Sequence, residues 1–203
     1  MAALMRRRRG LLAAAVLLGA GAFAGCDRGT AQFQSIDITG ADYAQRLALP
    51  DAADGRMRTL ADWGGKAVVV FFGYTQCPDV CPSTLAELAT VKRSLGADGD
   101  RVQAVFVTVD PERDTPEILR AYVGSFGPDF VALRGDAAQT LAIAKEFKVY
   151  FAKAAGSTPG SYTMDHTAGE YVFDPKGRIR LFTRYGTGPD ALVHDLKLLL
   201  AED

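Results

Sequence analysis

The sequence predicts an α/β domain, with a central β-sheet covered by helices on both faces. Strand-like and helix-like segments alternate from about residue 66 to residue 150. Two of the strand-like runs, 66–72 and 102–109, are almost wholly apolar, which is typical of strands that are buried on both faces. A pair of cysteines, Cys77 and Cys81, lies where the first of these strands gives way to a helix.

The composition fits one globular domain. The chain has 203 residues, of which 48% are apolar and 23% charged, with a formal net charge of -1. This is enough apolar material for an ordinary core. Because the charge is nearly balanced, we expect no nucleic-acid partner.

Residues 1–25 have the pattern of a secretory signal of the lipoprotein type. Arginines at 6–9 precede an apolar run, and small residues follow it. Cys26 comes directly after Phe23-Ala24-Gly25, a sequence that resembles the bacterial lipobox, in which the cysteine is lipidated and becomes the mature N-terminus. We expect lipidation of Cys26, with a retained N-terminal anchor as the alternative. Residues 26–40 are predicted to be a tether and residues 41–203 the folded domain.

The first half of the domain is predicted from turn and cap signals. Residues 41–62 contain two turn dipeptides and predict an N-terminal β-hairpin. The strand 66–72 follows, and Pro82 is predicted as the first residue of a helix, where a missing N–H has no consequence. One apolar stripe marks this helix, which ends at Gly96; it consists of Leu85, Leu88, Val91 and Leu95.

The second half begins with the strand 102–109 and a charged loop, 110–114. Thr115 as N-cap with Pro116 predicts the next helix, and Asp136 with Gln139 forms a capping box for another helix that runs through Phe147. The remaining predicted segments are a strand 130–133, a strand 148–153, an exposed loop 156–160, a loop 162–167 that leads into a strand 171–173, a turn 174–177, a strand 179–182 and a helix from Pro189.

The cysteine pair indicates thiolate chemistry. The positive end of a helix dipole favours the thiolate, the form that attacks disulfides and binds metals. The place of the cysteine pair at the first strand–helix junction resembles that of the cysteine pair in a thioredoxin-like domain. Three residues separate Cys77 from Cys81, whereas thioredoxin-type motifs have two. The wider loop lets both sulfurs face one site without forcing a disulfide, although a disulfide stays open.

A third metal ligand has to come from one of two histidines. His194 is out of phase with the apolar stripe of the last helix and is expected to face solvent. His166 precedes a late strand, a place that faces the cysteine loop in thioredoxin-like folds and usually holds a cis-proline. Two thiolates and an imidazole form a soft, incomplete ligand set that suits copper, as Cu(I) or Cu(II). A structural zinc site would need a fourth ligand.

Three carboxylates are candidates for orienting such a site from outside the ligand set. They are Asp110, Asp114 and Asp165. For Asp114 and Asp165, ordinary turn and capping roles are the favoured interpretation.

Three motifs together resemble the SCO/SenC family of copper-binding, thioredoxin-like proteins, which help to load the CuA centre of cytochrome c oxidase. They are residues 71–82 (FFGYTQCPDVCP), 109–116 (VDPERDTP) and 165–167 (DHT), and the similarity runs from about residue 39 to 200. The resemblance implies that Cys77, Cys81 and His166 are the copper ligands. It also implies a loop and hairpin inserted near His166, and it matches Asp110 and Asp114 to a spaced pair of aspartates.

The resemblance further implies partners and a location. The expected partners are the CuA-bearing subunit of cytochrome c oxidase, an upstream periplasmic copper chaperone and a membrane reached through lipid or an anchor. The expected location is the bacterial cell envelope, with the domain on the periplasmic side. We expect a copper carrier rather than an enzyme.

Two other functions use the same thiols. The first alternative is a thiol–disulfide reductase, with Cys77 and Cys81 as the redox pair, that keeps the CuA-site cysteines reduced. A thiol peroxidase is disfavoured, because peroxidases of this fold carry Pro and Thr upstream of the reactive cysteine, where this chain has Val70 and Tyr74.

Overall fold

The computed structural model describes residues 32–202, and the compact unit discussed below begins at Phe33. The predicted signal and Cys26 lie outside the described residues. Among residues 32–202, no helix combines the length and the apolar character needed to span a membrane.

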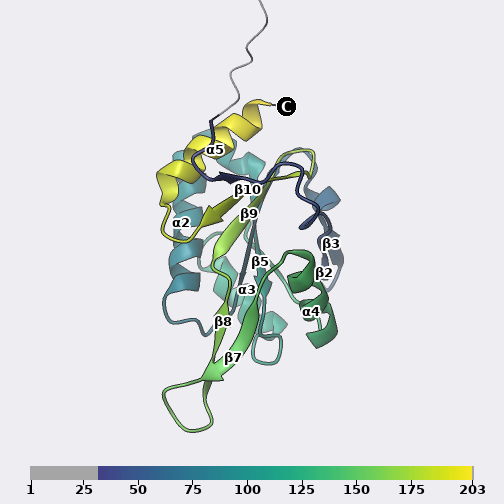
Figure 1. Ribbon diagram of the computed structural model, residues 1–203, viewed down its shortest axis with the longest axis vertical. Coiled ribbons are helices and arrows are strands. Elements are labelled where there is room, and N and C mark those ends of the chain that lie inside the picture. Colours follow the sequence, from purple (N-terminus) through teal and green to yellow (C-terminus); the bar gives the residue numbers. More distant parts are fainter. Residues whose placement is uncertain (1–31, 203) are drawn as a thin grey trace, which may run out of the picture. The chain divides into compact units, whose positions relative to one another are not determined.

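A six-stranded sheet forms the centre of the domain, in the order β1-β10-β9-β4-β5-β6 (Figure 1). Strands β4 (Ala67–Gly73) and β5 (Val102–Thr108) are parallel and adjacent, and every residue in both is buried. This confirms the two predicted buried strands. β6 (Val131–Leu133) is parallel to β5, whereas β9 (Gly169–Phe173) runs antiparallel to β4.

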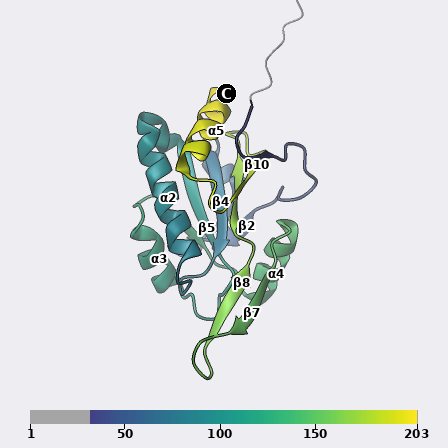
Figure 2. The same cartoon turned by 60° about the vertical axis from the view of Figure 1, so that its left-hand side comes forward.

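Helices cover both faces of this sheet. Figure 2 shows α2 (Val80–Ser94) and α3 (Pro116–Gly124) on one side of the central strands and α4 (Ala137–Glu146) on the other. α5 (Pro189–Ala201) packs beside α2. The predicted N-cap of α3 at Thr115 and the capping box of α4 at Asp136 and Gln139 are both present. The predicted layers are therefore confirmed.

The start of α2 differs from the prediction. The helix begins at Val80 with Asp79 as N-cap, so Pro82 is its third residue rather than its first. Proline is tolerated there because the first N–H groups of a helix have no partner within the helix. The predicted stripe is buried, and Gly96 follows the helix with φ of 60°. The consequence is that Cys81 lies inside the first turn of α2.

The N-terminal border of the domain also differs. β1 (Ile36–Asp37) pairs with β10 (Ile179–Arg184), and the backbone N–H groups of Gln34 and Ser35 each donate to the buried carboxylate of Asp195 at 2.8 Å. Residues 33–40 therefore belong to the domain rather than to the predicted tether. The N-terminal hairpin is present as β2 (Ala48–Pro50) and β3 (Met57–Thr59), followed by the 3₁₀ turn η1 (Leu60–Trp63).

A second, separate hairpin carries His166. β7 (Phe151–Ala155) and β8 (Tyr162–His166) pair antiparallel in a two-stranded sheet of their own. The prediction of a loop over residues 162–166 is therefore wrong, because these residues pair with β7, whereas the inserted hairpin near His166 that the family resemblance implies is present. The predicted strand 148–153 begins only at Phe151, since Lys148 has a φ of 53°, which ends α4 and is incompatible with a strand.

Candidate metal centre

The cysteine loop joins the buried end of β4 to the start of α2. Gly73 closes β4 at a point where a Cβ atom would lie 2.8 Å from Cys81 Sγ. A glycine there lets the helix bring its thiol close to the sheet. Cys81 is buried and Cys77 is half-buried, and both are free thiols. The sequence places the two sulfurs together because both belong to one short loop and the helix turn that follows it.

The two thiols have opposite protonation tendencies. The thiol of Cys81 and the N–H groups of Asp79 and Cys81 point at Cys77, and the Cys81 N–H donates to Cys77 Sγ at 3.3 Å. The Cys81 thiol, and after it His166 and these N–H groups, lower the pKa of Cys77 to about 3, although burial raises it. The pKa of Cys81 is raised, because its proton is held by the Cys77 sulfur and because burial disfavours the thiolate. The reduced pair is therefore one thiolate and one thiol.

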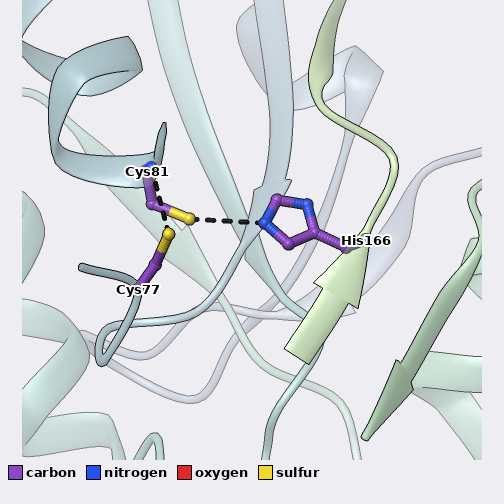
Figure 3. A group of neighbouring side chains, drawn as sticks. All are labelled: Cys77, Cys81 and His166. Atoms are coloured by element: carbon purple, nitrogen blue, oxygen red, sulfur yellow. Dashed lines mark hydrogen bonds between the residues drawn. The ribbon is translucent and has the colours of Figure 1, made fainter. Parts of the chain in front are cut away.

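His166 faces this pair from the end of β8 (Figure 3). Its Nε2 atom lies 3.5 Å from Cys81 Sγ, and its Nδ1 atom lies 3.0 Å from the carbonyl oxygen of Thr167. Since a carbonyl oxygen only accepts, Nδ1 carries the proton and the lone pair of Nε2 points at the sulfurs. The rings of Phe71 and Tyr74 meet the imidazole edge-on, each with a centroid distance of 6.0 Å.

The three side chains fit a soft metal ion. Cys77 Sγ, Cys81 Sγ and a His166 ring nitrogen all lie within 4.8 Å of one another, and no other such group of three occurs among residues 32–202. Two sulfurs and one imidazole nitrogen are donors that suit copper. A hollow of about 520 Å³ opens beside them and is lined by both Cys77 and His166. The site is thus open on one side.

Comparisons with known proteins agree with this geometry. Residues 39–201 match the family model described as SCO1/SenC. The chain belongs to the SCO1/SenC family. The mitochondrial SCO2 homolog of Bos taurus is 39% identical over 133 residues, which cover 64% of this chain and 49% of that protein. The chain thus spans about half the length of this relative and of the SCO2 homologs of Mus musculus and Homo sapiens.

Solved structures resemble the SCO1/SenC domain over most of its length. ScoI of Bradyrhizobium japonicum, solved with copper bound, is 40% identical, covers 76% of this chain and 97% of that chain, and gives a TM-score of 0.67. Apo Sco1 of Thermus thermophilus is 34% identical, covers 84% and 99%, and gives a TM-score of 0.72. The predicted thioredoxin-like fold is confirmed by these matches.

Of the three predicted carboxylates of this SCO1/SenC chain, Asp114 is buried and stabilises the cysteine loop through hydrogen bonds. It accepts hydrogen bonds from Thr75 Oγ1 at 2.6 Å and from Thr108 Oγ1 at 2.5 Å, and from the N–H of Thr75. Burial raises its pKa. Asp114 therefore ties the loop to the end of β5 and does not point into the three-ligand group.

Asp110 and Asp165 differ sharply from each other. Asp110 is 2% exposed and accepts from the hydroxyl of Tyr162, the first residue of β8, at 3.0 Å. It also forms an ion pair with Arg113. Asp165 is exposed on β8 and does not belong to the three-ligand group, although it lines the hollow.

Sequence reasoning missed Arg113 and Tyr162. Both were assigned to loops, and neither was given a role. The available signal was the spacing of Arg113 three residues after Asp110, in a loop that follows a buried strand. A charged residue there is expected to pair locally, but its contact with β8 is not visible in the sequence.

Proposed function

We propose that this protein binds copper through Cys77, Cys81 and His166 and delivers it to the CuA-bearing subunit of cytochrome c oxidase. The convergence of two sulfurs and a lone-pair nitrogen within 4.8 Å carries the proposal. The copper-bound state of the B. japonicum relative supports it. Copper is the cargo of such a carrier, and the open side of the site leaves a path for its exit.

The two oxidation states of copper would use different sets of these ligands. Cu(I) is satisfied by two thiolates, so Cys81 has to release its proton when Cu(I) binds. Cu(II) prefers an added nitrogen donor, which His166 supplies through Nε2. The hydrogen bond from Nδ1–H to Thr167 fixes the tautomer that this requires.

We also propose that the domain works at the outer side of a bacterial membrane. The supporting observation is the signal pattern that ends at Cys26, with lipidation of that residue as the attachment. At that location, a periplasmic copper chaperone would donate the copper to this protein. Globomycin, which blocks processing of lipidated precursors, should cause an unprocessed form of the chain to accumulate, whereas a Cys26→Ser variant should show no lipid mass.

Replacement of His166 tests the copper site. In the reduced full chain, His166→Ala should retain Cu(I) binding by the two thiolates but change the thiolate-to-Cu(II) absorption band and weaken Cu(II) binding by about 10-fold or more. His194→Ala is the matched control, because it removes the other histidine, whose Nδ1 pairs with Asp195 in α5. An unchanged Cu(II) spectrum in His166→Ala would contradict the three-ligand site.

The lowered pKa of Cys77 and the raised pKa of Cys81 favour a second candidate function, that of a thiol–disulfide reductase. The Cys77 thiolate would attack a partner disulfide, forming a mixed disulfide and expelling one partner thiolate. That thiolate takes the Cys81 proton, and Cys81 then attacks Cys77 Sγ, releasing the second partner thiolate. The partner gains two electrons and Cys77–Cys81 becomes a disulfide. Reduction of an oxidised CuA-site peptide by the copper-free chain, without copper transfer from the loaded chain, would favour this function.

A further inference from the structure

The strand that carries His166 does not pair with the central sheet. Among the described strands, β8 pairs only with β7, and this small sheet shares no backbone ladder with the six central strands. Figure 1 shows the two strands as a separate hairpin that continues away from β9. Backbone pairing therefore does not fix the distance between His166 and the cysteines. Two residues join His166 to β9, which holds that end of β8 near the sheet, and side-chain contacts have to hold the rest of the hairpin.

Arg113 contacts β8 at Tyr162, the first residue of the strand and the end opposite His166. Its guanidinium carbon lies 3.6 Å from the ring centroid of Tyr162, and its Nη1 donates to the Tyr162 carbonyl oxygen at 2.8 Å. Its Nε donates to Asp110, whose other carboxylate oxygen accepts from the Tyr162 hydroxyl at 3.0 Å. Asp110, Arg113 and Tyr162 thus form a closed triangle, here called the hairpin latch.

The same arginine also reaches the cysteine loop. Nη1 of Arg113 donates to Gln76 Oε1 at 3.1 Å, and the guanidinium lies 5.7 Å from the ring centroid of Tyr74. Gln76 precedes Cys77, and Tyr74 packs edge-on against the His166 ring. One side chain therefore touches both the loop that holds the thiols and the strand that holds the histidine.

The latch is built from groups that are expensive to separate. Asp110 is 2% exposed, so loss of its cation would leave a buried carboxylate without its ion-pair partner. A planar guanidinium stacks flat on an aromatic ring and still donates from the fork of N–H groups at its edge, whereas the ammonium of lysine has three donors but no planar fork. The Nη2 atom of Arg113 is buried and has no hydrogen-bond partner in the described residues. The guanidinium is therefore held by the hydrogen bonds of Nε and Nη1 and by its stacking on Tyr162.

We propose that Arg113 is a positioning residue that sets the approach of His166 to the two thiols. This deepens the proposed function and rests on it. Arg113 acts through β8 and through Gln76, and it touches no ligand atom. Loss of the latch should make the position of β8 less well defined. The metal bond from His166 should then weaken, whereas the two cysteine ligands should stay in place. Cu(II) binding should suffer, and Cu(I) binding should not.

Two conservative variants test the latch. Arg113→Lys retains the charge but loses the stacking and the forked donors, and Tyr162→Phe retains the ring but loses the hydroxyl bond to Asp110. Arg120→Lys, on the exposed face of α3, is the matched control. In the reduced full chain, the two latch variants should lose about 10-fold or more in Cu(II) affinity and show an altered electron paramagnetic resonance spectrum. Cu(I) affinity, measured against a competing chelator, should stay within about 3-fold of the unmodified chain, because its two thiolate ligands are unchanged.

A copper-free measurement separates this inference from the proposed function. In the metal-free chain, amide hydrogen exchange of β8 should become faster in both latch variants, while exchange in β4 should not. Equal losses of Cu(I) and Cu(II) affinity, or unchanged exchange in β8, would overturn the positioning role. If His166→Ala leaves Cu(II) binding unchanged but Arg113→Lys speeds exchange in β8, the copper proposal fails and the latch itself stands.

Discussion

Cys77 and Cys81 lie at the junction of β4 and α2, whereas His166 lies at the end of β8. Every residue of β4 is buried, and α2 packs its apolar stripe onto the core. Of the five residues of β8, only Met164 is buried. The thiols are therefore placed by the core and by one short loop, and the histidine by a small hairpin that joins β9 after two residues and by a few side-chain contacts.

This contrast indicates that the two kinds of ligand respond differently to perturbation. The thiolate pair should behave as a rigid unit whose chemistry follows from the start of α2. The histidine should be the more adjustable ligand, since β8 shares no hydrogen-bonded ladder with the central sheet. A site with one fixed half and one adjustable half suits a cargo that has to be both held and released.

The largest expected effect concerns the thiol chemistry of the fixed half. Because the pKa of Cys77 is lowered to about 3, Cys77 remains a thiolate throughout the range above that value. Its alkylation by iodoacetamide should be nearly independent of pH between pH 5 and 7, whereas an ordinary thiol of pKa about 8.5 reacts about 100-fold faster at pH 7 than at pH 5. Peptide mass spectrometry of the reduced chain should find the label on Cys77 and not on buried Cys81.

A partner variant separates the cause from simple exposure. Cys81→Ala removes the thiol that donates to Cys77, so the pKa of Cys77 should rise and its alkylation at pH 5 should become slower. Cys81→Ser retains an O–H donor and should preserve more of the low-pH reactivity. A rate that rises about tenfold per pH unit in the unmodified chain would contradict the thiolate–thiol pair.

A smaller effect is expected from adding a methyl group at Gly73, where β4 meets the cysteine loop. Gly73→Ala would place a Cβ 2.8 Å from Cys81 Sγ and 2.9 Å from a ring carbon of Phe106. Overpacking of this kind typically costs about 1–3 kcal/mol, and both the free energy of unfolding and Cu(I) affinity should fall. Chemical denaturation followed by circular dichroism measures the first, and chelator competition measures the second.

Gly124→Ala is the matched control for this glycine. Gly124 ends α3, and an added Cβ would meet no atom within 4 Å. Alanine favours the helix by up to about 1 kcal/mol, so this variant should be as stable as the unmodified chain or more so. If Gly73→Ala were equally harmless, the cysteine junction would be less tightly packed than the structure shows.

The smallest effect is expected at the edge of the adjustable half. Lys153 of β7 pairs with Glu112 at 2.6 Å, but the two side chains are 48% and 66% exposed. Exposed ion pairs contribute little to stability. Lys153 Nζ also lies 4.6 Å from the Tyr162 ring centroid, but Arg113 still stacks on that ring in its absence. Lys153→Ala should therefore leave the denaturation midpoint and the Cu(II) spectrum nearly unchanged. A loss as large as that of Arg113→Lys would mean that the whole hairpin edge, rather than the latch, positions His166.

The sequence alone determined the features that depend on neighbours along the chain. The apolar runs of β4 and β5, the caps of α3 and α4 and the turn at residues 174–177 were all predicted, because burial on both faces and backbone capping leave local signatures. The closeness of Cys77 and Cys81 was equally local. His166 was singled out from the sequence by its place before a late strand, and the structure does bring it to the thiols.

The tertiary structure alone decided the features that depend on distant contacts. His166 meets Cys81 across 85 positions, Asp114 meets Thr75 across 39, and Arg113 meets Tyr162 across 49. The pairing of β8 with β7, the inclusion of residues 33–40 in the domain and the burial of Asp110 had no local signature. Local propensity fixes backbone conformation over a few residues, but the positions of side chains from separate elements are set by how the whole core packs together.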